Sequence, residues 1–129
     1  MSTLADTTAH PVDALVEIAA GTDWTPVCRI TDLIPGRGVA ALVDGAQVAV
    51  FLDRTGEVYA VGNYDPCSGA HVISRGILGS RGDVPVVASP MYKQAFDLRT
   101  GLCLDADDEP TALPVYGVRI RQTAGAKVA

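Results

Sequence analysis

The sequence predicts an all-β domain made of small antiparallel sheets, arranged as a sandwich or a partial barrel. The clearest sign is Asp44-Gly45 between two β-type segments, because this dipeptide supplies the positive φ angles of a tight hairpin turn. From Trp24 onward, short runs of apolar and β-branched residues recur, and Gly, Pro and Asp separate nearly all of them. No segment shows a long helical period, so helix is expected only as isolated turns.

Eight strands are expected in chain order. Residues 24–30 form the first, and residues 39–43 and 47–52 form the hairpin around Asp44-Gly45. A further turn at residues 53–56 leads into the strand 57–61. The remaining strands are expected at residues 84–88, 94–98, 102–104 and 115–121. Residues 31–34 are expected to form one capped helical turn before Pro35-Gly36.

The pattern divides the chain into three parts. Residues 1–21 are rich in Ala, Thr and Asp without a sustained period, which predicts a flexible N-terminal arm. Residues 22–121 carry the expected strands and form the domain, and residues 122–129 are expected to be a C-terminal tail. A chain of 129 residues with 48% hydrophobic residues is large enough for one domain with a buried core.

Charge and hydropathy exclude several classes of function. The formal net charge of −5 argues against general binding of nucleic acid or anionic membranes, because both are polyanions. No window approaches the roughly 20 apolar residues of a membrane span. Residues 1–11 lack the basic and apolar regions of a secretory signal. We therefore expect a cytoplasmic protein without nucleic-acid or membrane partners.

No catalytic, cofactor-binding or metal site can be assembled from the sequence. Cys28, Cys67 and Cys103 are far apart without a CxxC pair, so reduced structural thiols are expected, with Cys67 the most exposed. His71 is the only histidine inside the expected domain and is interpreted as a loop residue. Residues 76–82 lack the lysine of a phosphate-binding loop and are interpreted as a flexible loop. The acidic run starting at Asp105 resembles a solvated linker more than a calcium site.

Residues 59–101 resemble the two cluster-holding loops of a Rieske iron–sulfur domain. Such a domain presents a Cys-x-His pair and a Cys-x-x-His pair to hold a [2Fe–2S] cluster. The corresponding segments here are Asn63-Tyr64-Asp65 and Ser89-Pro90-Met91-Tyr92. Asn, Ser and Tyr are poor ligands for soft metals, and one carboxylate does not replace two thiolates and two imidazoles. The sequence therefore predicts a Rieske-like fold without an iron–sulfur cluster.

Three runs extend the resemblance, at residues 62–70, 74–77 and 87–94. Over about residues 22–121 the chain is similar to the small subunit of cytoplasmic NAD(P)H-dependent nitrite reductase. The resemblance implies a non-catalytic subunit of an oxidoreductase that reduces nitrite to ammonium in nitrate assimilation. It implies a large catalytic subunit as partner, which would carry FAD, an iron–sulfur cluster and sirohaem. The residues expected to contact this partner are Asn63, Asp65, Ser89, Tyr92 and Lys93.

Two other functions fit the same residues. The chain would be a Rieske-type electron-transfer ferredoxin if unusual ligands held a cluster. It would be a free-standing protein-binding module if the scaffold served another partner, since polar loop tips commonly contact proteins. A self-contained enzyme is disfavoured, because no nucleophile–base pair or cofactor fingerprint is present.

Overall fold

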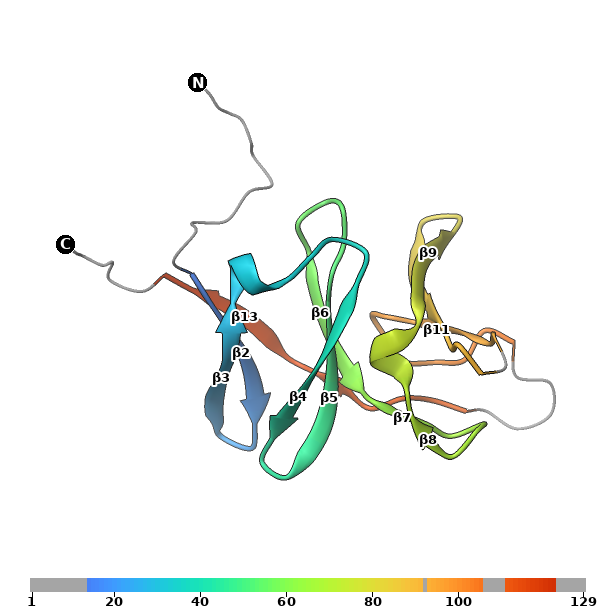
Figure 1. The fold of residues 1–129 in the computed structure, drawn as a ribbon, viewed down its shortest axis with the longest axis horizontal. Coiled ribbons are helices and arrows are strands. Elements are labelled where there is room, and N and C mark those ends of the chain that lie inside the picture. Colours follow the sequence, from blue (N-terminus) through green and yellow to red (C-terminus); the bar gives the residue numbers. More distant parts are fainter. Residues whose placement is uncertain (1–13, 92, 106–110, 123–129) are drawn as a thin grey trace, which may run out of the picture.

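A computed structural model describes residues 14–91, 93–105 and 111–122 of the chain. Figure 1 shows three sheets side by side along the longest axis, with a small two-stranded pair below the third. Every pairing of named strands is antiparallel, and the described residues contain two short 3-10 helices and no α-helix. The predicted all-β fold of small antiparallel sheets is confirmed. The sheets are open, and none of the described sheets closes into a barrel.

The first sheet has the order β13-β2-β3 and joins the two ends of the described chain. Strand β2 (Leu15–Ala20) lies between β3 (Asp23–Arg29) and β13 (Val118–Arg121). The carboxylate of Glu17 accepts hydrogen bonds from Arg119 Nε at 2.6 Å and from Arg121 Nη1 at 3.3 Å. Two guanidinium groups therefore compensate a carboxylate that is only 2% exposed.

Strand β2 corrects the predicted N-terminal arm, which extended through residue 21. Val16 and Ile18 are fully buried and pair in register with Cys28 and Thr25 of β3. The sequence did not reveal this strand as a buried one, because Glu17 is itself buried between Val16 and Ile18, and a buried carboxylate is unusual unless it is paired. The folded part of the chain therefore includes residues 14–21, while residues 1–13 of the predicted arm and residues 123–129 of the predicted tail lie outside the described residues.

The second sheet has the order β12-β6-β5-β4 and lies at the centre of the molecule. Its strands are β4 (Gly38–Val43), β5 (Ala46–Leu52), β6 (Val58–Gly62) and β12 (Val115–Tyr116). The turn between β4 and β5 has φ angles of 50° at Asp44 and 84° at Gly45, so the predicted hairpin is confirmed. The strand predicted at residues 115–121 is divided at Gly117 between two sheets.

Both faces of β5 are buried, which makes it the central element of the core. Val48 and Val50 belong to a cluster that includes Val16 and Ile18 of the first sheet. Phe51 points the other way, into a cluster that reaches the third sheet. Alternation along β5 thus supplies two apolar cores, one on each face of the central sheet.

The third sheet has the order β11-β10-β9. Its strands are β9 (Ile77–Arg81), β10 (Val84–Ala88) and β11 (Ala95–Asp97). Between β6 and β9 lie the two-stranded pair β7 (Tyr64–Asp65) and β8 (Ala70–His71) and the 3-10 helix η2 (Ile73–Arg75). The other 3-10 helix, η1 (Ile30–Asp32), forms near the helical turn expected at residues 31–34.

Strand β9 corrects the interpretation of residues 76–82 as a flexible loop. Its five residues pair with all of β10, although most of their side chains are exposed. An edge strand with glycine and polar side chains has little apolar alternation, so backbone pairing rather than pattern defines it. The segment expected at residues 102–104 forms two isolated bridges instead of a strand.

Gly62, where the central sheet leads into the loops, packs closely against Pro114. A Cβ atom on Gly62 would lie 2.7 Å from Cγ of Pro114, so only glycine allows this approach. The Gly62 N–H donates to the carbonyl of Pro114 at 2.8 Å. Within the described residues, no helix is long and apolar enough to cross a membrane.

Candidate functional site

Asn63 follows β6 directly and is 2% exposed. Its Nδ2 donates to Gln47 Oε1 at 3.0 Å and to the carbonyl of His71 at 3.3 Å. Its Oδ1 accepts a hydrogen bond from the Ser74 N–H at 2.7 Å. One amide therefore links β5 to both β8 and η2 and uses all of its polar atoms in doing so. Asn63 sets the path of the first loop, defined here as residues 62–76.

Asp65 lies two residues further and is fully buried. Its Oδ1 accepts the Cys67 N–H at 2.9 Å, and its Oδ2 accepts the Ser68 hydroxyl at 3.0 Å. Oδ2 also accepts the hydroxyl of Ser89 at 2.5 Å, a short charge-assisted hydrogen bond. Ser89 is 1% exposed and begins the second loop, defined here as residues 89–94. The Asp65–Ser89 hydrogen bond therefore joins the two loops from the inside.

The environment of Asp65 keeps the carboxylate ionised. Burial is the largest influence and raises the pKa, but the hydrogen bonds from Ser89, Cys67 and Ser68 together outweigh it, so the pKa of Asp65 is lowered. These hydrogen bonds stabilise the charged form of a carboxyl group that has no ion-pair partner among the described residues. The ionised state in turn keeps both oxygens available as acceptors.

The second loop is a tight turn closed at Ser89. The Ser89 N–H donates to the carbonyl of Gln94 at 2.9 Å, and the Lys93 N–H donates to the carbonyl of Ser89 at 2.9 Å. The Met91 N–H donates to Ser89 Oγ at 3.2 Å. Lys93 adopts a φ of 63°, in the left-handed region that a residue with a side chain seldom occupies. These hydrogen bonds hold the described residues of the loop in place, with Met91 and Lys93 exposed at its surface.

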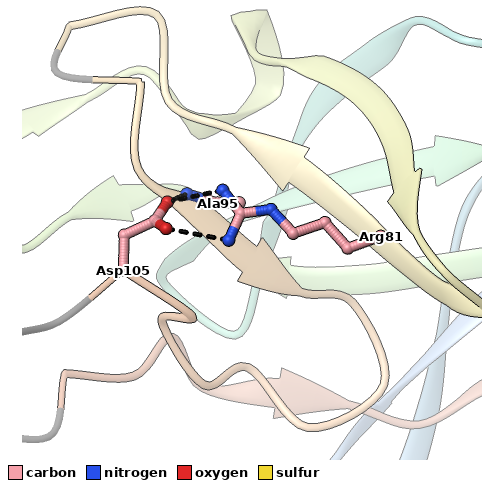
Figure 2. Close-up of polar contacts among 3 residues, drawn as sticks. All are labelled: Arg81, Ala95 and Asp105. Atoms are coloured by element: carbon pink, nitrogen blue, oxygen red, sulfur yellow. Dashed lines mark hydrogen bonds and ion pairs between the residues drawn. The ribbon is translucent and has the colours of Figure 1, made fainter.

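An ion pair fixes the exit of the second loop into β11 (Figure 2). Arg81 donates from Nη1 and Nη2 to the two oxygens of Asp105, at 2.8 and 2.9 Å. Asp105 Oδ2 also accepts the N–H of Ala95 at 2.9 Å. Hydrogen bonding to Arg81 is the largest cause that lowers the pKa of Asp105. Asp105, predicted to lie in a solvated linker, therefore holds strand β11; residues 106–110 of the acidic run lie outside the described residues.

A shallow groove lies beside the first loop. Residues lining it include Gln47, Asn63, Tyr64, His71 and Pro114. The Tyr64 and His71 rings meet edge to face, with centroids 5.2 Å apart. Because Tyr64 is 48% exposed, this edge presents aromatic surface at the outside of the molecule.

Comparison with known proteins identifies the family. A Rieske-like [2Fe-2S] domain model matches residues 23–126. The NADH nitrite reductase small subunit of Salmonella typhimurium is 40% identical over 99 residues, which are 76% of this chain and 90% of that protein. The chain belongs to the Rieske-like domain family, among the nitrite reductase small subunits.

Two further relatives are a solved structure and a large subunit. A crystal structure of a candidate NADH-dependent nitrite reductase small subunit from Mycobacterium tuberculosis is 48% identical, with a TM-score of 0.68, and covers 82% of this chain and 86% of that chain. The large subunit of the NAD(P)H nitrite reductase of Klebsiella oxytoca is 39% identical over 87 residues, which are 67% of this chain and only 9% of that protein. A Rieske-like domain of this type therefore also occurs inside a large subunit.

The residues at the four ligand positions do not fit the [2Fe–2S] cluster for which the family is named. The amide of Asn63 is fully hydrogen-bonded, and the carboxylate of Asp65 is occupied by three donors. Ser89 Oγ donates to Asp65 and accepts from Met91. Thiolate and imidazole are absent from these three positions, and Tyr92, the fourth, lies outside the described residues. No group of three potential metal ligands occurs among the residues that the structure describes.

The predicted site residues divide into two groups. Asn63, Asp65 and Ser89 are buried and shape the loops from within, so their side chains are not surface contacts in this structure. Lys93 is exposed, as a partner-contacting residue must be. Sequence reasoning missed Gln47 and Ser68, whose hydrogen bonds to Asn63 and Asp65 complete the network. Only the spacing of Ser68, three residues after Asp65 in a turn sequence, signalled its contact.

Cys28 and Cys67 show no sign of activation. Cys67 is exposed as predicted, and all three cysteines are free. Burial and the nearby Asp65 raise the pKa of Cys67, and burial together with Asp32 raises the pKa of Cys28 to about 11. A raised pKa leaves little reactive thiolate at neutral pH.

Proposed function

We propose that this chain is the small subunit of an NAD(P)H-dependent nitrite reductase and supports the reduction of nitrite to ammonium by a large catalytic subunit. The observation that carries the proposal is the 40% identity to a nitrite reductase small subunit across 90% of that protein. The related segment inside the Klebsiella oxytoca large subunit supports the choice of partner, because fused domains commonly correspond to separate subunits that act together.

The role proposed for this chain is structural rather than catalytic. Asp65 and Ser89 are hydrogen-bonded to each other, and Asn63 is hydrogen-bonded to Gln47, His71 and Ser74, so these three buried polar side chains are already engaged within the fold. Electron transfer from NADH or NADPH would then use the FAD, iron–sulfur cluster and sirohaem of the large subunit. This chain would bind that subunit in the cytoplasm and stabilise or orient it, as part of nitrate assimilation.

The test is reconstitution. The large subunit from the same organism is purified as a holoenzyme, and NAD(P)H-dependent ammonium formation from nitrite is measured with and without this chain. The proposal predicts a stable complex and an activity that depends on the chain. A large subunit that neither binds the chain nor responds to it would contradict the proposal and favour the free-standing binding module.

The electron-transfer alternative has its own observable. The chain is purified anaerobically, and its iron content and visible absorption are measured. The hydrogen-bonded state of Asn63, Asp65 and Ser89 predicts a colourless protein without stoichiometric iron. Two iron atoms per chain with a reducible absorption band would establish the ferredoxin instead.

A further inference from the structure

We infer that one end of the third sheet docks onto an acidic surface of the large subunit, with Lys93 as the principal cation. We call this surface the docking end and define it by Arg75, Ile77, Met91 and Lys93. The inference rests on the proposed function, since it takes the large subunit as the partner, and it names the surface and chemistry of the contact.

Strand register brings these four residues to one end of the sheet. Ala88 of β10 pairs with Ala95 of β11 on one side and with Ile77 of β9 on the other. Arg75 precedes Ile77 by two residues, and the second loop, with Met91 and Lys93, connects Ala88 to Ala95. The docking end therefore comprises Ile77 in the last row of paired residues and the three other residues just beyond that row. The turn that joins β9 to β10 is at the opposite end.

The backbone of Lys93 gives the first reason to assign it a function. Only two described residues other than glycine have a positive φ, Asp44 and Lys93. Asp44 lies in a hairpin turn, where a short polar side chain tolerates this conformation. A lysine has no such local compensation, and glycine would occupy the position without steric cost. A strained residue that persists at an exposed position indicates that its side chain is used.

Charge and exposure give the second reason. Within the described parts of the chain, neither Arg75 nor Lys93 has an ion-pair partner. The nearby carboxylates are already engaged. Asp65 is fully buried and Asp105 is paired with Arg81, while Asp53, which lines the same cavity as Ile77, accepts three hydrogen bonds within its own turn. The docking end thus carries uncompensated positive charge on a chain whose net charge is −5.

Exposed apolar side chains accompany these cations. Ile77 is 72% exposed and Met91 is 53% exposed. Apolar side chains beside unpaired cations are the usual composition of a contact patch, in which apolar area is buried and charge fixes orientation and speeds association. Carboxylates around an apolar centre are therefore the complementary chemistry on the large subunit.

The experiment measures affinity and stability on the same variants. Lys93→Gly and Lys93→Asn both remove the cation and suit a left-handed residue, while Lys93→Arg keeps the charge. The matched control is Arg29→Gln, which removes an exposed cation from β3 in the first sheet, away from the docking end. Dissociation constants for the large-subunit holoenzyme are measured at two salt concentrations, and melting temperatures are measured on the free chain.

We expect Lys93→Gly and Lys93→Asn to weaken binding about tenfold, with a smaller salt dependence and a melting temperature equal to or above wild type. Lys93→Arg should restore most of the affinity, and Arg29→Gln should bind normally. Unchanged affinity in both neutral variants would overturn the docking end. A lower melting temperature in both neutral variants would also overturn it, because Lys93 would then be needed for the stability of the fold. If the wild-type chain itself does not bind, the proposed function fails, which is a distinct result.

Discussion

On the two faces of β5, aliphatic and aromatic groups pack against each other, whereas the two loops beyond the central sheet are held mainly by hydrogen bonds to buried side chains. Val50 and Phe51 illustrate the first arrangement, and Asp65 with Ser89 illustrates the second. Apolar packing is non-directional and contributes in proportion to the area buried. Hydrogen bonds to a buried carboxylate are directional, and removing one partner costs stability because a buried polar atom is left unsatisfied. The sheets therefore supply stability, and the polar network supplies loop shape.

The largest expected loss of stability comes from removing a side chain from the apolar core around β5. Phe51→Ala removes a fully buried ring that packs against Gly38 and the third-sheet cluster, so we expect a loss of about 3–5 kcal/mol in the free energy of unfolding. Urea denaturation measures this loss. Leu42→Ala, on a side chain that is 69% exposed, is the control and should stay within about 0.5 kcal/mol of wild type. Similar losses in both would refute the two-core description.

A smaller and more local effect is expected from breaking the polar network. Ser89→Ala leaves Asp65 without its shortest hydrogen bond, so we expect a loss of about 1–3 kcal/mol. The distinguishing measurement is amide hydrogen exchange, which should accelerate at Cys67 and in the second loop while β5 keeps its protection. Ser80→Ala, on an exposed residue of β9, should change neither quantity. Uniform acceleration across the sheets would show that the network is not a separate local unit.

Lowering the pH should weaken the buried carboxylates without any mutation, while the apolar cores are unaffected. The pKa values of Asp65 and Glu17 are both lowered in the folded chain, from ordinary values of 3.8 and 4.5. A lowered folded pKa gives stability that is fully present above the unfolded value and is lost as the pH falls through the folded value. Melting temperatures should therefore decline below about pH 4.5. Asp65→Asn should start lower at neutral pH and decline less; a parallel decline would assign the acid sensitivity elsewhere.

The smallest effect is expected at the Arg81–Asp105 ion pair, because it lies at the surface. Arg81→Gln should lower the melting temperature only slightly, since the Ala95 N–H keeps its acceptor. The difference from wild type should shrink in high salt, which screens the pair. Asp105→Asn removes the charge but keeps an oxygen for Ala95, so both variants should behave alike. A large loss in either would show that the pair is essential for the third sheet.

How much the sequence predicted depends on whether local pattern or distant contact decides the structure. The Asp44-Gly45 hairpin was predictable because its φ angles are a property of the two residues. Strand β2 was not predicted, because Glu17 depends on Arg119 and Arg121, more than 100 residues away in the sequence. Strand β9 was missed for a similar reason, since its pairing with β10 replaces the missing apolar pattern.

The site was predictable in position but not in arrangement. Spacing identified Asn63, Asp65 and Ser89 as the positions that correspond to Rieske ligands, and the comparisons confirm the Rieske-like family. Spacing does not show that Asp65 and Ser89 meet at 2.5 Å, because that requires two loops to approach from different sheets. The role of the predicted site residues as partner contacts stays a prediction. In the proposed docking end, the exposed Lys93 makes the contact, and the buried residues do not.

The hydrogen bond between Asp65 and Ser89 has a consequence for how this protein matures. An inorganic cluster must be assembled elsewhere, delivered and inserted, and it is lost when iron is scarce or oxidants are abundant. A carboxylate and a hydroxyl are encoded in the chain and meet as soon as the loops fold. The join between these loops is therefore made by two side chains of the chain itself, and this contact forms by folding rather than by delivery of an added group.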